Sequence, residues 1–307
     1  MELIWNPGDS QAWQDVHGQA RAAMQQHWRY GEAWARLRVP GQRVAFVQNG
    51  QWQGIAQFTV RRLAGLCTLA LCSRGPVWRE GTSPAFKQAA IGRLRATLPA
   101  RWPRVCLVSP DDPDPAAAGL AGRQRMVTGY ATVTVDLRPD PAGLRQALHG
   151  KWRNRLAAAE KSPLRVQAMG SKPAQVQWLI DRDLAQQQHR GYQSLPADFV
   201  PTWQAVADEP RDAMMGLRAD LGRDAAAAML FLLHGRSATY YIGWSDDAGR
   251  GHGAHNLLLW QAMLALRERG VEALDLGGID TQRGAGIARF KIGSGGRVQT
   301  FSGTWLA

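Results

Sequence analysis

The sequence has no long apolar run and no leader-like beginning. The longest apolar stretch, AAAAMLFLL at residues 225–233, is about half of the roughly 18 residues that a membrane-spanning helix needs. The first residues, MELIWNPGDSQAWQDV, lack the basic start and apolar centre of a signal peptide. We therefore expect a soluble, cytoplasmic protein without a transmembrane segment.

Cysteine and histidine are also sparse. Cys67, Cys72 and Cys106 form no CxxC pair and lie in apolar, strand-like stretches, so we interpret them as small core residues in a reducing compartment. The seven His residues show no HxH or HxxxH grouping. The sequence therefore predicts no metal site and no metal or redox cofactor.

Acidic residues are too few to balance the basic ones. The 37 Lys and Arg against 25 Asp and Glu give a formal charge of +12 and a sequence pI near 10.4, and only five of the basic residues are Lys. A surplus of this size is typical of proteins that meet a polyanion: a nucleic acid, a phosphorylated substrate or a membrane surface. Arg also forms the better fork for phosphate.

The 307 residues suffice for two domains of roughly 150 residues each. Hydrophobic residues make up 45% and charged residues 20%, which is typical of folded globular chains. Near RPDPAG (138–143), Asp140 can cap a helix that has Pro141 in its first turn. We place the boundary there, giving domains 1–136 and 137–307, although the last strand-like piece, RVQTFSGTWLA, could return to the first domain.

A similar order of elements occurs twice. In the first half, strands at 44–48 and 54–60 flank an Asn49-Gly50 turn, and a strand at 67–72, a helix at 84–97 and a buried strand at 105–108 follow. In the second half, strands at 225–233 and 238–244, a helix at 254–269 and a strand at 273–277 repeat the order of hairpin, helix and strand. The sequence therefore predicts a duplicated α/β unit.

The stretch LDLGGIDTQRGAGIARFKIGSGG (274–296) is the most informative for chemistry. A buried strand ends in Asp275 and the pair Gly277-Gly278, where a ligand could approach the backbone closely. Lys291 follows Phe290 and precedes further glycines, which suits contact with an anion. Asp275 could act as a general base, or it could order the turn after its strand.

Four segments together resemble the Fem family of aminoacyltransferases, over about residues 26–306. The family's last signature is matched by DLGGI followed by FKIGSGG, and its R-G-P-V element by Arg74-Gly75-Pro76-Val77. Its K-x-R helix resembles KWRNRLAAAEK (151–161), and its R-x-G-(F/Y) element resembles HRGY (189–192).

The resemblance implies an α/β protein with two tandem GNAT-like acyltransferase domains, each a mixed sheet flanked by helices. It implies transfer of an aminoacyl group from aminoacyl-tRNA to an amine of a peptidoglycan precursor or a similar acceptor, with possible proximity to the membrane surface. Phe290 and Lys291 match the family's active-site pair, in which the Lys stabilises the developing oxyanion, a role worth a few kcal/mol. Substrate-binding positions carried over are Arg74, Tyr240, His189, Arg190, Tyr192, Asp275, Gly277 and Gly278.

A basic helix supplies the expected contact with tRNA. Lys151, Arg153 and Arg155 lie in KWRNRLAAAEK, and residues 151 and 155 share a helix face. The repulsion between them is tolerated where solvent or an anion lies between. The stretch could be an ordinary solvated helix face, or it could contact the phosphates of tRNA or of the acceptor, which would make binding strongly dependent on salt.

The sequence also departs from the family, mostly at acceptor contacts. The usual Tyr-x-Tyr reads Tyr240-Tyr241-Ile242, and His189 stands where the family has Arg. One alternative is an acyl-CoA-dependent N-acyltransferase, because Arg250-Gly251-His252-Gly253-Ala254-His255 follows a strand and opens a helix, as a pyrophosphate-binding turn does. A second alternative is a non-catalytic GNAT-like module that binds tRNA.

Overall fold

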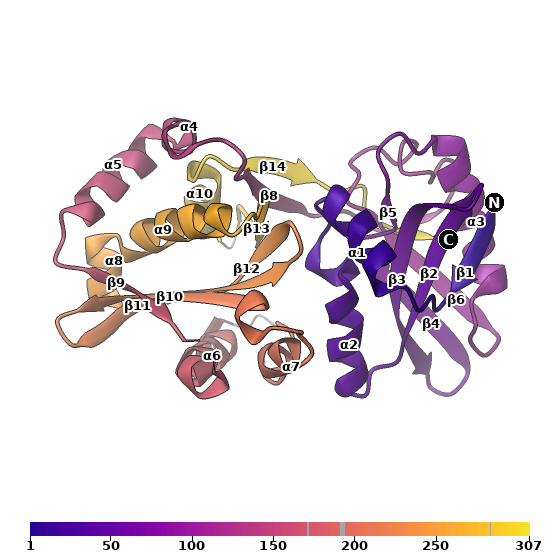
Figure 1. Cartoon of the computed structure of the whole chain (residues 1–307), viewed down its shortest axis with the longest axis horizontal. Coiled ribbons are helices and arrows are strands. Elements are labelled where there is room, and N and C mark those ends of the chain that lie inside the picture. The colour runs from indigo at the N-terminus through magenta and orange to yellow at the C-terminus, as the bar shows by residue number, and fades with distance from the viewer. Residues whose placement is uncertain (171, 191–193, 283) are drawn as a thin grey trace. The chain divides into compact units, whose positions relative to one another are not determined.

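The structure is a computed structural model that describes residues 1–170, 172–190, 194–282 and 284–307 (Figure 1). The chain forms two compact units. The first comprises residues 1–131 and 299–307, and the second comprises residues 132–298. The change of unit at residues 131 and 132 lies five residues before the predicted boundary at 136, and the last nine residues join the first unit.

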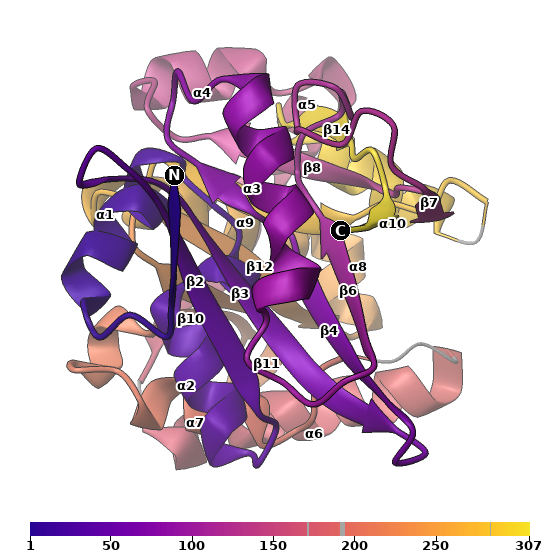
Figure 2. The ribbon, with the colours of Figure 1, turned by 90° about the vertical axis from the view of Figure 1, so that its right-hand side faces the viewer.

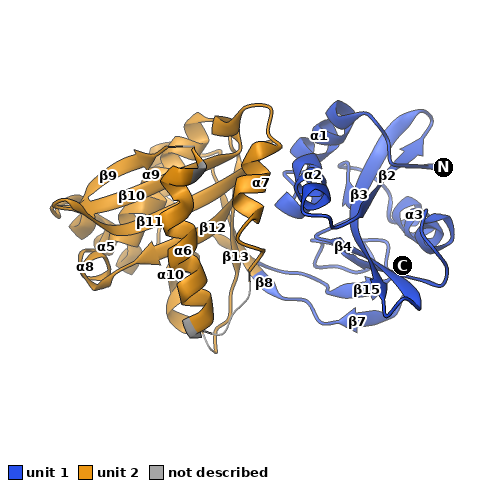
Figure 3. Ribbon diagram, turned by 90° about the horizontal axis from the view of Figure 1, so that it is seen from below, with its two compact units in different colours: residues 1–131, 299–307 blue, residues 132–298 orange. Residues whose placement is uncertain are grey.

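The first unit is a sheet with helices on both faces. Figure 2 shows α3 in front of the sheet, and Figure 3 shows α1 and α2 against the opposite face. The strand order is β1-β2-β3-β4-β6-β15-β7, and β5 pairs with β3. The elements are β1 (Glu2–Trp5), α1 (Ser10–Gln19), the 3-10 helix Met24–Gln26, α2 (Trp28–Arg36), β2 (Gly41–Gln48), β3 (Gln51–Leu63), β4 (Cys67–Ser73), β5 (Val77–Trp78), α3 (Pro84–Thr97), β6 (Arg104–Ser109), β7 (Arg125–Val127) and β15 (Thr304–Leu306).

The second unit has the same layers. Figure 1 shows α9 on one face of its sheet and α6 with α7 on the other. The strand order is β14-β8-β13-β12-β11-β10-β9. The elements are β8 (Ala131–Asp136), α4 (Pro141–Ala147), α5 (Gly150–Glu160), β9 (Arg165–Met169), α6 (Pro173–Arg190), α7 (Phe199–Ala205), the 3-10 helix Pro210–Asp212, β10 (Met214–Leu221), β11 (Asp224–His234), β12 (Ser237–Ser245), α8 (Asp247–His252), α9 (Ala254–Glu268), β13 (Ala273–Gly278), α10 (Ala285–Gly293) and β14 (Arg297–Thr300).

Both units contain an antiparallel meander, a crossover helix and a parallel strand. In the first unit β2, β3 and β4 form the meander, and α3 leads to β6, which is parallel to β4. In the second unit β10, β11 and β12 form the meander, and α9 leads to β13, which is parallel to β12. The predicted correspondence of the two hairpins is therefore shifted by one strand: β11 and β12 correspond to β3 and β4. The error arose because β10, MMGLRADL, was not recognised as a strand.

Local sequence signals account for several element ends. Asn49 and Gly50 both have positive φ, at 51° and 73°, and connect β2 to β3 in the turn that the NG pair predicts. The Asp140 side chain accepts a hydrogen bond of 2.8 Å from the Gly143 amide and caps α4, which has Pro141 in its first turn.

The chain runs between the two sheets twice, once from β7 to β8 and once from β14 to β15. β15 lies between β6 and β7 in the first sheet, whereas β14 pairs with β8 in the second. Where the two segments meet, the Phe301 amide donates to the Tyr130 carbonyl at 3.0 Å. A Cβ on Gly129 would lie 1.7 Å from the Phe301 carbonyl oxygen, so this close approach requires glycine.

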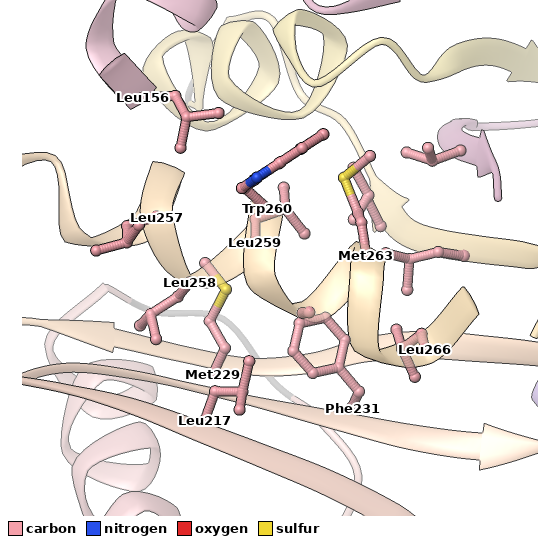
Figure 4. Close-up of a cluster of buried hydrophobic side chains, with 14 of the residues drawn as sticks. Leu156, Leu217, Met229, Phe231, Leu257, Leu258, Leu259, Trp260, Met263 and Leu266 are labelled. Atoms are coloured by element: carbon pink, nitrogen blue, oxygen red, sulfur yellow. The ribbon is translucent and has the colours of Figure 1, made fainter. Parts of the chain in front are cut away.

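The core of the second unit lies between its sheet and α9. Figure 4 shows Leu217, Met229 and Phe231 pointing from the sheet towards Leu258 and Leu266 of the helix. These five side chains are at most 7% exposed. Their burial supplies the main apolar stabilisation of the sheet–helix contact.

Truncating this core should destabilise the protein. We expect Leu258→Ala to lower the free energy of unfolding by about 2–5 kcal/mol, because the residue is fully buried and its loss leaves a cavity. Met126→Ala, at a side chain that is 50% exposed, is the control and should change it by no more than about 0.5 kcal/mol. Urea unfolding measures both, and equal midpoints would contradict this packing.

Candidate active site

The two central parallel strands of the second unit stop pairing early. β12 and β13 pair only through residues 237–239 and 273–275, although both strands continue, to Ser245 and Gly278. In the first unit the equivalent strands pair in register from Thr68 and Arg104 to Ser73 and Ser109. The carboxyl ends of such strands are where open α/β sheets bind ligands. In the second unit, the ends of β12 and β13 are therefore not paired with each other, whereas the equivalent ends of β4 and β6 in the first unit are paired.

The turn at the end of β13 is ordered by Asp275. Its Oδ1 accepts hydrogen bonds of 2.7 Å from the Gly277 amide and from the Thr132 hydroxyl on β8. Gly277 has a φ of 77°, a conformation that glycine adopts without steric cost. Asp275 was considered either as a general base or as the residue that orders the turn, and these two hydrogen bonds order the turn.

Lys291 extends from α10 to this turn. Its Nζ donates to the Gly278 carbonyl at 2.8 Å, and the residue is only 9% exposed. A Cβ built on Gly277 would lie 3.6 Å from Nζ. Burial lowers the pKa of Lys291, and the charge of Asp275 acts in the opposite direction. The structure thus brings together four predicted site residues: Asp275, Gly277, Gly278 and Lys291.

Phe290 packs against α5 and α9. Its ring packs against Trp152 of α5, with ring centroids 6.0 Å apart, and lies 6.1 Å from the ring of His255. The Trp152 indole also donates to the Phe290 carbonyl at 3.1 Å. The role of this ring in the described residues is to fix the helix that carries Lys291.

Tyr240 lies where β12 leaves its partner strand. A bulge sets Phe231 opposite Tyr240 and Leu230 opposite Ile242, so Tyr241 is the extra residue. The Tyr240 ring packs on Phe231 with centroids 5.6 Å apart. Its hydroxyl reaches over Gly243, where a Cβ would lie 1.6 Å from the oxygen. Tyr240 is therefore adjacent to the unpaired edge of β12.

The turn considered for pyrophosphate binding is packed against α5. Residues 247–252 form the short helix α8, and Gly253, with φ 71°, leads into α9. The Arg155 guanidinium donates to the carbonyls of Arg250 and Gly251, the latter at 2.7 Å. A Cβ on Gly253 would lie 3.0 Å from Arg155 Nε. Arg155, which is predicted to contact tRNA, thus also ties α5 to this turn.

The remaining predicted contacts in the second unit lie apart from the Lys291 turn in the sequence. Lys151 and Arg153 are exposed on α5. His189 and Arg190 are the last residues of α6, and their side chains are outside the described part of the structure. Tyr192 lies outside the described residues altogether.

Arg74, in the first unit, lines a cavity of about 310 Å³. It directly follows β4, and Asp111 lies two residues after β6; because Ser73 and Ser109 are paired, these parallel strands bring the two side chains together. Arg74 Nη2 donates to Asp111 Oδ2 at 2.9 Å, and the guanidinium lies 4.4 Å from the Phe301 ring centroid. The cavity therefore combines aromatic walls with an arginine whose charge is paired.

Two further features concern the described residues as a whole. They contain no cluster of three or more His, Cys, Asp and Glu residues with the geometry to hold a metal ion. Within the same residues, no helix is both long and apolar enough to cross a membrane.

Sequence reasoning missed two residues that build the Lys291 site. Thr132 holds Asp275 from the neighbouring strand, and Trp152 holds the backbone of α10. A Cβ on Gly293 would lie 2.9 Å from the Trp152 ring, so these elements pack closely. The sequence indicates that Trp152 points inward, because it is a large apolar residue between Lys151 and Arg153. Nothing in the sequence around Thr132 indicates its contact with Asp275.

Part of the sequence matches a known domain family, and the fold matches solved structures. Residues 144–291 match the acetyltransferase (GNAT) domain family. No curated protein matches the chain. Among solved structures, FemX superposes with a TM-score of 0.82 at 13% identity, over 100% of this chain and 97% of FemX.

Two other solved structures have the same fold over most of their length. The C-terminal domain of a putative lysylphosphatidylglycerol synthetase from Agrobacterium fabrum gives a TM-score of 0.53 at 14% identity, over 97% of this chain and 91% of that domain. A tandem GNAT protein from the clavulanic acid biosynthesis pathway gives a TM-score of 0.51 at 14% identity, over 100% of this chain and 98% of that protein.

The predicted fold class is confirmed. The protein is a mixed α/β chain with two GNAT-like domains, and it has the fold of FemX along its whole length. At 13% identity the likeness to FemX shows the fold, and the GNAT match covers residues 144–291.

The ionisation of Lys291 can be tested directly, because the chain has only five Lys residues. In protein labelled with 13C-lysine, the Cε signal that is lost in Lys291→Arg should titrate below pH 10.5, since burial lowers the pKa of Lys291. Asp275→Asn should lower that pKa further by removing the opposing charge, whereas Asp280→Asn, the control, should leave it in place. Titration at or above pH 10.5 would contradict the buried site.

Proposed function

We propose that this protein is an aminoacyltransferase, which moves an aminoacyl group from aminoacyl-tRNA to the amine of a peptidoglycan precursor peptide or a similar acceptor. The observation that carries the proposal is the buried Lys291, held beside Gly277-Gly278 where β12 and β13 part. This arrangement agrees with the resemblance to the Fem family and with the acyltransferase fold.

Lys291 is suited to stabilise the transition state. When the acceptor amine attacks the ester, the carbonyl oxygen becomes an oxyanion, and a fixed cation in a water-poor site lowers the energy of that charge. The hydrogen bond to Gly278 holds Nζ in place before the reaction starts. Glycines at 277 and 278 leave the backbone open to close approach by the ester.

The reaction balances without a cofactor. The amine nitrogen forms a bond to the ester carbonyl carbon, and collapse of the tetrahedral intermediate breaks the bond to the ribose oxygen of tRNA. The proton lost by the amine is taken up by the departing ribose oxygen, which leaves as a free hydroxyl group. Positioning and electrostatic stabilisation would supply most of the rate acceleration.

The donor is inferred from two features of α5. Lys151 and Arg153 are exposed and available to tRNA phosphates. The turn at residues 250–255, which an acyl-CoA pyrophosphate would need, is packed against Arg155 of the same helix. Acyl-CoA as donor remains the alternative that the GNAT family match favours.

The cavity around Arg74 is our candidate for part of the acceptor site. Its walls include Tyr130 and Phe301, and the Arg74–Asp111 pair offers both donors and acceptors. The identity of the acceptor rests on the resemblance to the Fem family. Tyr240, at the bulge of β12, lies in the second unit and is assigned to the acyl group's surroundings.

The donor is identified by a transfer assay. Purified protein receives labelled aminoacyl-tRNAs or labelled acetyl-CoA together with an extract of cell-envelope precursors, and label is followed into an RNase-resistant, amine-linked product. We expect transfer from tRNA, and a loss of about a hundredfold or more in kcat for Lys291→Ala. The exposed Lys172→Ala is the matched control and should keep activity. Transfer from acetyl-CoA alone would overturn the proposed donor.

The contact with tRNA should appear in the salt dependence of binding. Replacing Lys151 and Arg153 with Gln removes two exposed charges, so tRNA binding should weaken and the slope of log K against log salt should fall by about one for each charge. Arg165→Gln, at an exposed position on β9, is the control. Filter binding at several salt concentrations measures the slopes, and an unchanged slope in the double variant would exclude contact of tRNA with these two residues.

A further inference from the structure

One end of the first unit carries a surface that neither the candidate active site nor the proposed reaction uses. It comprises the turn between β3 and β4, the loop between α3 and β6, and the adjoining ends of β3, α3 and β6, and Figure 2 shows the turn and the loop at the lower end of the sheet. We call it the tip patch. Its members are the apolar residues Leu63, Leu66 and Trp102 and the basic residues Arg61, Arg62, Arg95, Arg101 and Arg104.

The apolar members of the tip patch are unusually exposed. Leu66 is 75% exposed, Trp102 63% and Leu63 46%. Every residue from 61 to 66 and from 101 to 103 is exposed. Large apolar side chains gathered on neighbouring loops of a folded protein mark an interaction site, whereas isolated ones do not.

Hydrogen bonds hold the two segments side by side. Thr68, the second residue of β4, donates from its hydroxyl to the Arg101 carbonyl at 2.7 Å and from its amide to the Pro103 carbonyl at 2.8 Å. Arg62 Nη1 donates to the same Thr68 hydroxyl at 3.2 Å. The two loops therefore present their side chains as one preformed surface.

In the described part of the chain, no carboxylate forms an ion pair with an arginine of the tip patch. The acidic residues nearest in sequence are Glu32, Glu80 and Asp111, and residues 33–110 contain 12 Lys and Arg against the one Glu. Arg62, Arg95 and Arg104 donate hydrogen bonds to uncharged groups, namely backbone carbonyls and the Thr68 hydroxyl. The guanidinium carbons of Arg95 and Arg104 lie 5.4 and 5.5 Å from the Trp102 ring centroid.

We propose that the tip patch docks the protein on an anionic phospholipid bilayer. Arg side chains would meet the lipid phosphates, Trp102 would lie at the headgroup level that indole rings favour, and Leu63 and Leu66 would enter the acyl boundary. The exposed leucines and the positive charge of the same surface together fit this partner.

RNA is the other polyanion that the charge would attract, and the apolar residues favour the bilayer over it. Protein surfaces that bind single-stranded nucleic acid stack the bases on aromatic rings and guanidinium groups. Leu63, at the end of β3, and Leu66, in the turn that follows, are exposed aliphatic side chains and offer no such surface. The tip patch is also separate in sequence from Lys151 and Arg153, to which tRNA contact is assigned.

Vesicle flotation with the full-length protein tests the proposal, with vesicles of phosphatidylcholine alone or mixed equally with phosphatidylglycerol. We expect flotation only with the mixed vesicles, and weaker flotation at high salt. Leu66→Ser with Trp102→Ser should weaken binding about tenfold or more, and Arg61→Gln about fivefold. Met126→Ser and Arg223→Gln, an exposed apolar residue and an exposed arginine on another hairpin turn, should bind as the wild type does.

Three results would overturn the proposal: no flotation with the anionic vesicles, flotation that does not depend on phosphatidylglycerol, or equal binding by the Leu66→Ser, Trp102→Ser variant. Binding of total tRNA by the same variants separates the two polyanions. If the double variant loses tRNA binding and keeps vesicle binding, the surface belongs to RNA. Unchanged transfer activity with soluble substrates in the double variant would confirm that it is folded and that docking is separate from the proposed reaction.

Discussion

The hydrogen bond from the Gly277 amide to the Asp275 carboxylate is the constraint on which the candidate site depends. It fixes the left-handed turn at Gly277 and so directs the Gly278 carbonyl towards Lys291. Burial of an ammonium group carries a desolvation cost. The Gly278 carbonyl and the nearby negative charge of Asp275 offset part of it. The result is a fixed cationic group in a place with little water, where it interacts most strongly with a developing negative charge.

The two units share a topology and differ at the equivalent position. In the first unit β4 and β6 stay paired to their ends, and the residues that follow, Arg74 and Asp111, neutralise each other beside an aromatic cavity. In the second unit the pairing of β12 and β13 stops after Thr239 and Asp275, and a buried Lys occupies the turn. A duplicated framework therefore presents a closed ladder in one unit and open strand edges in the other. Only the second arrangement leaves backbone groups of parallel strands available to an extended ligand.

Much of this framework follows from the sequence because its signals are local. The Asn49-Gly50 turn, the Asp140 cap and the apolar face of residues 84–97 each depend on neighbours within a few positions. β10 was missed because MMGLRADL, with Gly216 and Arg218 in its middle, has no clear alternation. Its strand conformation follows from pairing with β9 and β11 on either side. The bond from Thr132 to Asp275 joins residues 143 positions apart, so no local pattern could predict it.

The packing of α5 connects donor choice to the architecture of the second unit. A compact pyrophosphate is bound best by convergent backbone amides at the start of a helix. Here Arg155 donates to the carbonyls of residues 250 and 251, and its side chain and that of Ala159 lie against Gly253, whereas residues 250–252 are exposed. On α5 itself, the side chains of Lys151 and Arg153 are exposed to an approaching anion. Separate, solvated charges of this kind gain most from a long polyanion with many phosphates, because each contact releases its own counterion. The exposed charges of α5 are therefore the feature that supports the proposed nucleic-acid donor.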